Sequence, residues 1–89
     1  MNIYVGNLNV ATSELQLKNL FAPFGEIKAL KIVLNHHSGK SKGFAFVEMT
    51  ERSAGEEAIV KLNNFLLDEK HITVNESANS FRLNPKSQL

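Results

Sequence analysis

"KGFAFVEM", residues 42–49, alternates between two kinds of side chain along its length. In an extended strand, successive side chains point to opposite faces of the sheet. One face of this strand would hold Ala45, Val47 and Met49, and the other would hold Lys42, Phe44, Phe46 and Glu48. The first set is typical of a buried core. The second set places two aromatic rings among charged residues, which suits neither a core nor an ordinary solvent-exposed surface.

The composition indicates one ordinary globular domain. The chain has 89 residues, of which 43% are hydrophobic and 21% are charged, enough for a single core. The formal net charge is +1 at pH 7, so any affinity for nucleic acid depends on where the charges lie and not on their sum. Cysteine is absent, which excludes disulfides and thiolate metal sites and suits a reducing compartment.

The sequence does not predict a membrane or secretory segment. No apolar run approaches the ~18 residues of a membrane span. A strand pattern begins at the second or third residue, which leaves no room for a signal peptide. We therefore expect a cytoplasmic protein with no membrane contact.

Hydrophobic periodicity predicts the element order β-α-β-β-α-β. The alternating runs "NIYVGNL", "EIKALKIVL" and "HITVN" predict three strands in addition to 42–49. Two segments have helical spacing instead, with apolar stripes at Leu17, Leu20, Phe21 and Phe24 and at Ala54, Ala58, Ile59 and Leu62. Each helix would begin with a capping box, formed by Ser13 with Gln16 and by Ser53 with Glu56. Gly55 weakens the second helix by roughly 1 kcal/mol relative to alanine.

This order is the split βαβ arrangement, an α+β sandwich of the ferredoxin-like type. Right-handed crossovers would place both helices on one face of a four-stranded antiparallel sheet and leave the other face uncovered. The first and third strands are then central neighbours, so Tyr4 would lie beside Phe44 and Phe46, with Lys42 at one end of the aromatic row. Flat rings stack on unpaired bases, each worth roughly 1–3 kcal/mol, and a lysine meets phosphate. Packing of the rings under a tail, a third helix or a partner subunit is the alternative.

Two motifs resemble those of the RNA-recognition motif family. "KGFAFVEM" agrees with the family octamer at seven of eight positions, with Met49 in place of the final aromatic residue. "IYVGNL", residues 3–8, resembles the companion hexamer, and "FGEIKALKI", "SGKSKG" and "LDEKHITVN" stand at the expected places. The short single-domain members known from bacteria are the most similar, although this chain lacks the glycine-rich tail of many relatives. The resemblance implies an RNA-recognition motif over residues 1–76 and a polar tail over residues 77–89.

The resemblance also implies roles for individual residues. Tyr4 and Phe46 match the rings that stack on bases, Phe44 the ring that contacts sugars, and Lys42 the basic residue that meets phosphate. Weaker matches, at positions that often touch base edges, are Asn7, Asn75 and Glu76. Met49 alternates to the core side, so its departure from the family pattern leaves the binding face intact.

Charge placement agrees with such a site. Between Glu26 and Glu48 the chain has four lysines, Lys28, Lys31, Lys40 and Lys42, whereas the second helix has Glu51, Glu56 and Glu57 against Arg52 and Lys61. A basic edge opposite an acidic back would let one side contact a phosphate backbone. Lys31 therefore joins the candidate RNA-binding residues. An ordinary solvated mixture of charges is the alternative.

Other classes of function have less support. A phosphatase on this fold would need a phosphate cradle and a positioned arginine, but only Arg52 and Arg82 are present, and Asp68, the one aspartate, lies in a predicted turn. No H-E-x-x-H, G-x-S-x-G or P-loop pattern occurs. His36 and His37 lack a third ligand, so we expect no metal, and we expect no enzyme activity.

A protein-protein interaction module of the same fold is the alternative function. Phe65 and Leu66 form an apolar cluster before the last strand that would be partly exposed, while Leu67 matches a family core position. Members that bind proteins would be expected to lose the aromatic rings of the sheet, so the intact rings favour RNA.

We therefore predict a monomer that binds roughly two to four unpaired nucleotides of single-stranded RNA on its sheet. Single-stranded DNA is the alternative nucleic acid. We expect no cofactor and no small-molecule substrate, and a role as a post-transcriptional regulator or RNA chaperone. The tail contains Phe81 and Arg82, which would block the RNA site, extend it or leave it unaffected.

Overall fold

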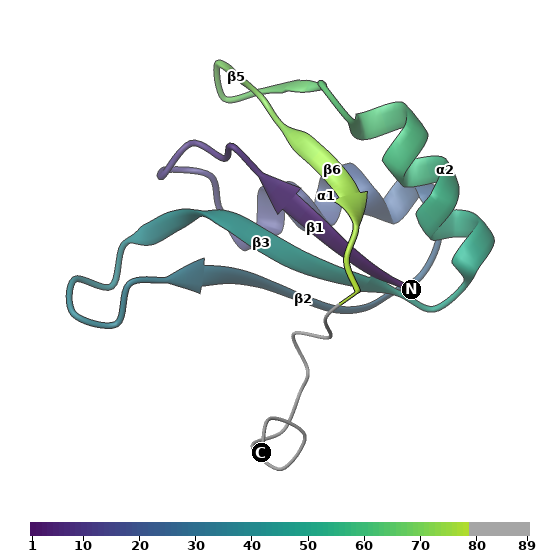
Figure 1. The fold of residues 1–89 in the computed structure, drawn as a ribbon, viewed down its shortest axis with the longest axis horizontal. Helices are drawn as coiled ribbons and strands as arrows, with labels where there is room; N and C mark the ends of the chain where they lie inside the picture. Colours follow the sequence, from purple (N-terminus) through teal and green to yellow (C-terminus); the bar gives the residue numbers. More distant parts are fainter. Residues whose placement is uncertain (79–89) are drawn as a thin grey trace, which may run out of the picture.

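The computed structural model describes residues 1–78 and has the predicted ferredoxin-like architecture (Figure 1). Its elements are β1 (Asn2–Gly6), α1 (Glu14–Phe21), the 3₁₀ turn η1 (Ala22–Phe24), β2 (Ile27–Leu34), β3 (Ser41–Met49), α2 (Arg52–Leu62), β4 (Leu66–Leu67), β5 (Lys70–His71) and β6 (Thr73–Glu76). The main sheet has the strand order β2-β3-β1-β6, and every neighbouring pair is antiparallel. The tail residues Phe81 and Arg82 lie outside the described residues.

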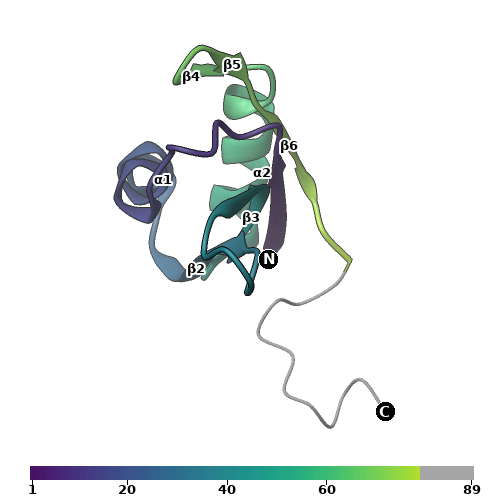
Figure 2. The same cartoon turned by 90° about the vertical axis from the view of Figure 1, so that its left-hand side faces the viewer.

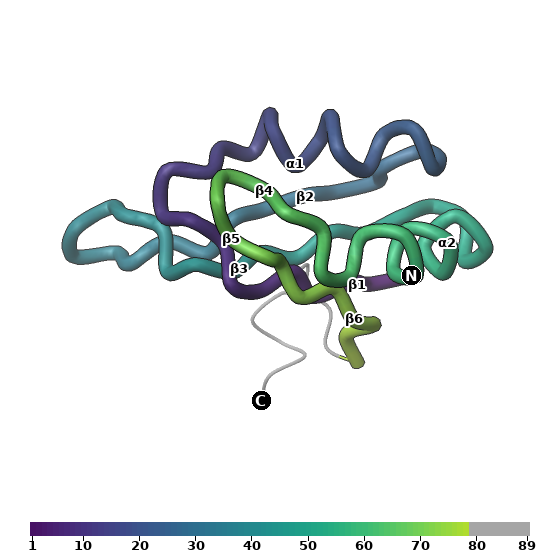
Figure 3. Tube along the Cα trace, turned by 90° about the horizontal axis from the view of Figure 1, so that it is seen from above, coloured from purple at the N-terminus to yellow at the C-terminus, as the bar shows by residue number. Residues whose placement is uncertain are grey.

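Both helices lie on the same side of this sheet, as Figures 2 and 3 show from two directions. The core lies between the two layers and consists of Ile3, Val5, Leu8, Leu17, Phe21, Ile32, Ala45, Val47, Met49, Ala54, Ala58, Leu62, Ile72 and Val74. Every predicted inward position of β1, β3 and β6 is therefore buried. Neither helix of the described residues is long and apolar enough to cross a membrane.

The predicted capping box of α1 is confirmed. The Ser13 hydroxyl accepts a hydrogen bond from the Gln16 amide at 3.1 Å, and the Gln16 side chain accepts one from the Ser13 amide at 2.8 Å. In the first turn of the same helix, Glu14 accepts a hydrogen bond from the Ile32 amide at 3.2 Å. Because β2 is an edge strand, this carboxylate covers part of an otherwise unpaired edge.

The predicted capping box of α2 is wrong. The helix begins at Arg52, and its N-cap is Glu51, whose side chain makes no capping hydrogen bond. Close packing fixes this end of the helix instead. A Cβ at Gly25 would stand 2.7 Å from the Ala54 Cβ, and a Cβ at Gly55 would overlap the Met1 sulfur. Gly55 therefore weakens the helix but lets it approach the start of β1.

The register of β2 with β3 shifts at two places, between Ile27 and Ala29 and, by a bulge, between Ile32 and Leu34. Ile32 is opposite Ala45, but Leu34 is opposite Ser41, so β3 has two extra residues in this stretch. Gly43 lies in the bulge with φ 88°, a left-handed conformation that favours glycine. Its carbonyl accepts a hydrogen bond from the Leu8 amide at 2.9 Å. The bulge thereby joins the start of β3 to the loop after β1.

A small hairpin, β4–β5, precedes the last strand and was not predicted as strands. Its two-residue turn has φ 50° at Asp68 and φ 69° at Glu69, the positive values that tight hairpin turns require. The Asp68 carboxylate accepts hydrogen bonds from the Thr12 hydroxyl at 2.7 Å and from the Gln16 side-chain amide at 2.9 Å. The Asn9 side chain donates to the Asp68 carbonyl at 3.0 Å. The hairpin is therefore tied to the loop between β1 and α1.

We expect Asp68→Ala to lower the free energy of unfolding by about 1–3 kcal/mol, because it removes a charged acceptor and leaves the buried Thr12 hydroxyl without it. Urea denaturation would measure the change. Glu69→Ala is the matched control, since Glu69 also has positive φ but is exposed. Equal losses in the two variants would show that the turn backbone, and not the Asp68 network, limits stability.

Candidate nucleic-acid interface

Four of the predicted site residues form one row across the sheet. Tyr4 of β1 is directly opposite Phe46 of β3 on one side and Asn75 of β6 on the other, and Phe46 is opposite Lys31 of β2. Residues directly opposite each other in neighbouring strands share a face, and strands lie about 4.8 Å apart, so the row spans about 14 Å. We call the face that carries this row the aromatic face; α1 and α2 lie on the other side of the sheet.

Phe44 completes a triangle of rings on the aromatic face. The Tyr4 ring centroid lies 5.9 Å from that of Phe44 and 5.8 Å from that of Phe46, and the two phenylalanine centroids are 6.1 Å apart. The planes of Tyr4 and Phe46 meet at 63°, and those of Phe44 and Phe46 at 88°, so these pairs have the edge-to-face geometry that aromatic rings prefer. All three rings are partly exposed. They therefore support one another while presenting surface to a ligand.

The surface is hollowed on either side of the triangle. One hollow of about 480 Å³ lies beside Tyr4 and Phe44, and its rim includes Lys42, Lys70 and Asn9. A smaller hollow of about 310 Å³ is lined by Lys31, Val33, Leu34 and Phe46. Each of the two hollows beside the triangle is therefore bordered by at least one lysine.

Two polar residues that line the larger hollow, Asn9 and Lys70, were missed by sequence reasoning. Lys70 reaches it because the β4–β5 hairpin brings the start of β5 to this end of the sheet, and Asn9 because its loop is tied to that hairpin. No pattern in the sequence marks either residue, since their placement depends on contacts between segments about 60 residues apart.

Asn7 lies at this end of the sheet in a supporting position. It has φ 57°, and its side-chain amide donates a hydrogen bond to the His71 carbonyl at 2.8 Å. Asparagine is among the residues that adopt the left-handed conformation most readily. The side-chain nitrogen of Asn7 thus holds the loop after β1 against β5.

Glu76 is separated from the other predicted site residues. It is opposite Ile3, a buried residue, and so belongs to the helix side of the sheet. Its carboxylate accepts a hydrogen bond from the Arg52 guanidinium of α2 at 2.9 Å. Hydrogen bonding to Glu76, together with its negative charge, raises the pKa of Arg52 above its ordinary value. The strand alternation that buries Ile72 and Val74 also turns Glu76 away from the aromatic face.

Comparison with known proteins decides the family. The sequence model of the RNA recognition motif family matches residues 3–73 of this chain. The chain belongs to the RNA recognition motif family. This RNA recognition motif is 42% identical over 74 residues to the Small RNA binding protein 1 of Cucumis sativus, covering 83% of this chain and 46% of that protein. It is 38% identical over 77 residues to RbpD of Nostoc sp., named as an RNA-binding protein, covering 86% of this chain and 82% of that one.

A solved structure shares the fold of this RNA recognition motif. It is that of the Rna15 RRM with bound RNA (GU), with a TM-score of 0.79 and 28% identity, covering 89% of this chain and 84% of that one. The chain thus spans less than half the length of the cucumber relative but most of the length of RbpD and the Rna15 chain.

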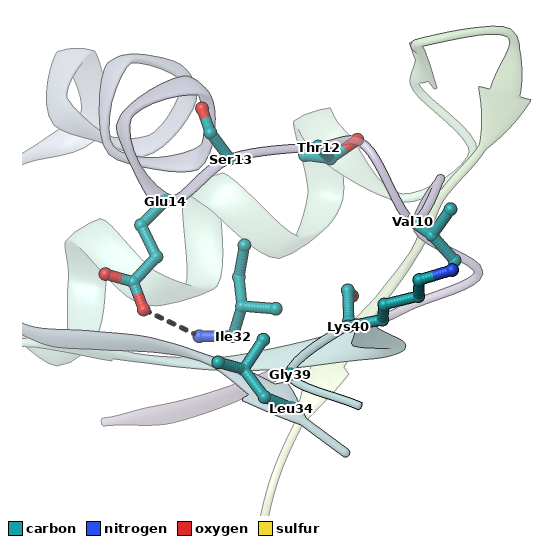
Figure 4. Close-up of a pocket in the computed structure, with 9 residues that line it drawn as sticks. Val10, Thr12, Ser13, Glu14, Ile32, Leu34, Gly39 and Lys40 are labelled. Atoms are coloured by element: carbon teal, nitrogen blue, oxygen red, sulfur yellow. Dashed lines mark hydrogen bonds between the residues drawn. The ribbon is translucent and has the colours of Figure 1, made fainter. Parts of the chain in front are cut away.

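Another hollow of the RNA recognition motif lies away from the aromatic face. It has a volume of about 510 Å³ and lies between the start of α1 and the β2–β3 hairpin, with Glu14, Leu34 and Lys40 in its wall (Figure 4). The Glu14 carboxylate there is engaged with the Ile32 amide. The His36 and His37 rings lie 4.5 Å apart in the hairpin loop, and residues 1–78 contain no group of three or more potential metal ligands.

Proposed function

We propose that this chain binds single-stranded RNA on its aromatic face. The observation that carries the proposal is the row of Lys31, Phe46, Tyr4 and Asn75, which comes from four different strands. Tyr4 and Phe46 each stack on a base, and Phe44 contacts the sugar between them. Stacking does not require a particular base, because every base has a π-face. Membership of the family and the RNA-binding names of the relatives support the proposal.

The lysines beside the rings supply positive charge that can neutralise the phosphates of RNA. Lys31 lies at one end of the row, and Lys42 and Lys70 border the hollow at Tyr4. Each can neutralise a phosphate and release a counterion, which makes binding depend on salt concentration. In the proposed complex, Asn75 and the exposed part of Asn7 contact base edges. Glu76 is left out of the proposed site because it faces Arg52.

We propose a role without chemistry, as a cytoplasmic post-transcriptional regulator or RNA chaperone that acts as a monomer. The RNA recognition motif would occupy residues 1–76. The intact ring triangle favours RNA over the protein-interaction alternative, because a protein partner would not need three rings positioned for bases. Competition between single-stranded RNA and single-stranded DNA of equal sequence would identify the preferred nucleic acid.

Tyr4→Ala and Phe46→Ala should each weaken binding of single-stranded RNA by roughly 1–3 kcal/mol, because each removes a stacking surface. Fluorescence anisotropy with a labelled mixed-sequence RNA would measure the loss.

Phe21→Ala is the control for stability, since Phe21 is a fully buried core residue. It should lower the free energy of unfolding by about 3–5 kcal/mol, well beyond the effect of either ring variant. A ring variant that unfolds as readily as Phe21→Ala, and whose folded fraction binds RNA normally, contradicts the assignment of the ring to the RNA site.

Lys42→Ala should weaken all RNA sequences about equally and should reduce the slope of log K against log salt by roughly 0.7, the value for one contact to a single strand. A salt titration of binding checks this. The matched control is Lys61→Ala, because Lys61 is an exposed lysine of α2. This variant should leave the salt slope unchanged. A loss confined to one base at one position would instead assign Lys42 to base recognition.

Asn75→Ala and Glu76→Ala test which side of β6 meets RNA. Asn75→Ala should weaken binding several-fold, because it removes hydrogen bonds from the aromatic face. Glu76→Ala should leave affinity within about twofold, because its carboxylate lies on the helix side with Arg52. Both affinities come from the same titration. A larger loss for Glu76→Ala than for Asn75→Ala would mean that RNA wraps around the sheet edge.

A further inference from the structure

Gly6 lies directly beneath the Tyr4 ring. The two residues are two positions apart in β1 and share the aromatic face. A Cβ at Gly6 would stand 2.6 Å from the Tyr4 hydroxyl oxygen and 2.7 Å from Cε2. Gly6 is itself buried, although it carries no side chain and belongs to the aromatic face. The outer end of the tyrosine ring therefore occupies the space where the side chain of residue 6 would otherwise stand.

The backbone does not require a glycine at this position. The glycines with positive φ among the described residues are Gly25, Gly39 and Gly43, and Gly6 is not one of them. Gly6 is also an ordinary ladder position of β1, directly opposite Thr73 of β6. Glycine within a strand often marks a close approach of another group to the backbone. Here the approaching group is the ring of Tyr4.

The position of the ring matters for the rest of the aromatic face. With its outer end over Gly6, the Tyr4 ring keeps centroid distances of 5.9 and 5.8 Å to the two phenylalanine rings and borders the hollow that Lys42 and Lys70 flank. A side chain at position 6 would push the hydroxyl end of Tyr4 outward, since the phenol is the more flexible partner. The ring would then leave the surface that it forms with Phe44 and Phe46.

We propose that Gly6 is a positioning residue for RNA binding: it keeps the space into which the Tyr4 ring folds, and so sets the angle at which that ring meets a base. The proposal rests on the function proposed above, because it requires Tyr4 to stack on RNA. It adds that the glycine of "IYVGNL" acts through Tyr4 alone.

The test is a cycle of three variants: Gly6→Ala, Tyr4→Ala and the double variant. Gly6→Ala should weaken binding of a mixed-sequence single-stranded RNA by at least about threefold, and at most by the loss that Tyr4→Ala causes. In the double variant, Gly6→Ala should cause no further loss, because the ring it displaces is absent. Such non-additivity is the mark of two residues that act as a unit.

Tyrosine fluorescence supplies a second readout. The chain has one tyrosine and no tryptophan, so its intrinsic emission reports on Tyr4 alone. RNA should quench this emission in the wild-type protein through stacking, and should quench it less in Gly6→Ala at saturating RNA. A purely structural role of Gly6 would lower the fraction of folded protein without changing the quenching of each bound molecule.

The outcomes separate this proposal from the proposed function. If Tyr4→Ala binds RNA as the wild type does, the proposed function fails, and the role of Gly6 fails with it. If Tyr4→Ala weakens binding but Gly6→Ala does not, or if Gly6→Ala causes the same further loss in the double variant, only the positioning role is overturned.

The proposal can still be tested if Gly6→Ala fails to fold. Should Gly6→Ala unfold, urea denaturation of the cycle decides, because removal of the Tyr4 ring should restore stability if the conflict is with that ring. An equal loss of stability in the presence and absence of the ring would overturn the proposal.

Discussion

The register between β1 and β3 is the constraint on which both sides of the sheet depend. In this register Ile3 faces Val47 within the core, while Tyr4 faces Phe46 on the aromatic face. A shift by one residue would exchange the two sets, burying the tyrosine and exposing the aliphatic side chains. Burial of the core therefore fixes the position of the aromatic rings. The register sets the face on which the rings lie, and their contacts with one another and the space over Gly6 set their orientation on it.

Contacts far apart in the sequence hold the ends of this central pair. The β4–β5 hairpin is tied to the loop after β1 through Asp68, and the same loop is tied to the β3 bulge by the hydrogen bond from Leu8 to Gly43. Leu8 and Gly43 themselves line the larger hollow of the aromatic face, together with Lys42 and Lys70. The backbone near the proposed RNA site is thus held by hydrogen bonds before any ligand arrives, which reduces the ordering cost of binding.

The two faces of the sheet have different roles, one in stability and the other in the proposed binding of RNA. The helix side supplies stability through an aliphatic core and keeps Glu76 paired with Arg52. The aromatic face carries rings and lysines that contribute little to that core. Such a division lets substitutions on one face change binding while the other face keeps the fold. Gly6 belongs to the aromatic face, since its small size makes room for the Tyr4 ring and is not required by the backbone.

The sequence by itself determined the order of the two helices and the four strands of the main sheet, the buried face of these strands, the first capping box and the shared face of the three rings, because period-2 and period-3.6 patterns follow directly from strand and helix geometry. It also placed Lys31 and Asn75 on the same face of the sheet as the rings. It did not predict the β4–β5 hairpin, or the start of α2, where close packing against Gly25 and Met1 outweighs a local cap. Nor did it predict the side on which Glu76 lies or the contribution of Lys70. Those features depend on strand register and on contacts between distant segments, and only the tertiary structure decided them.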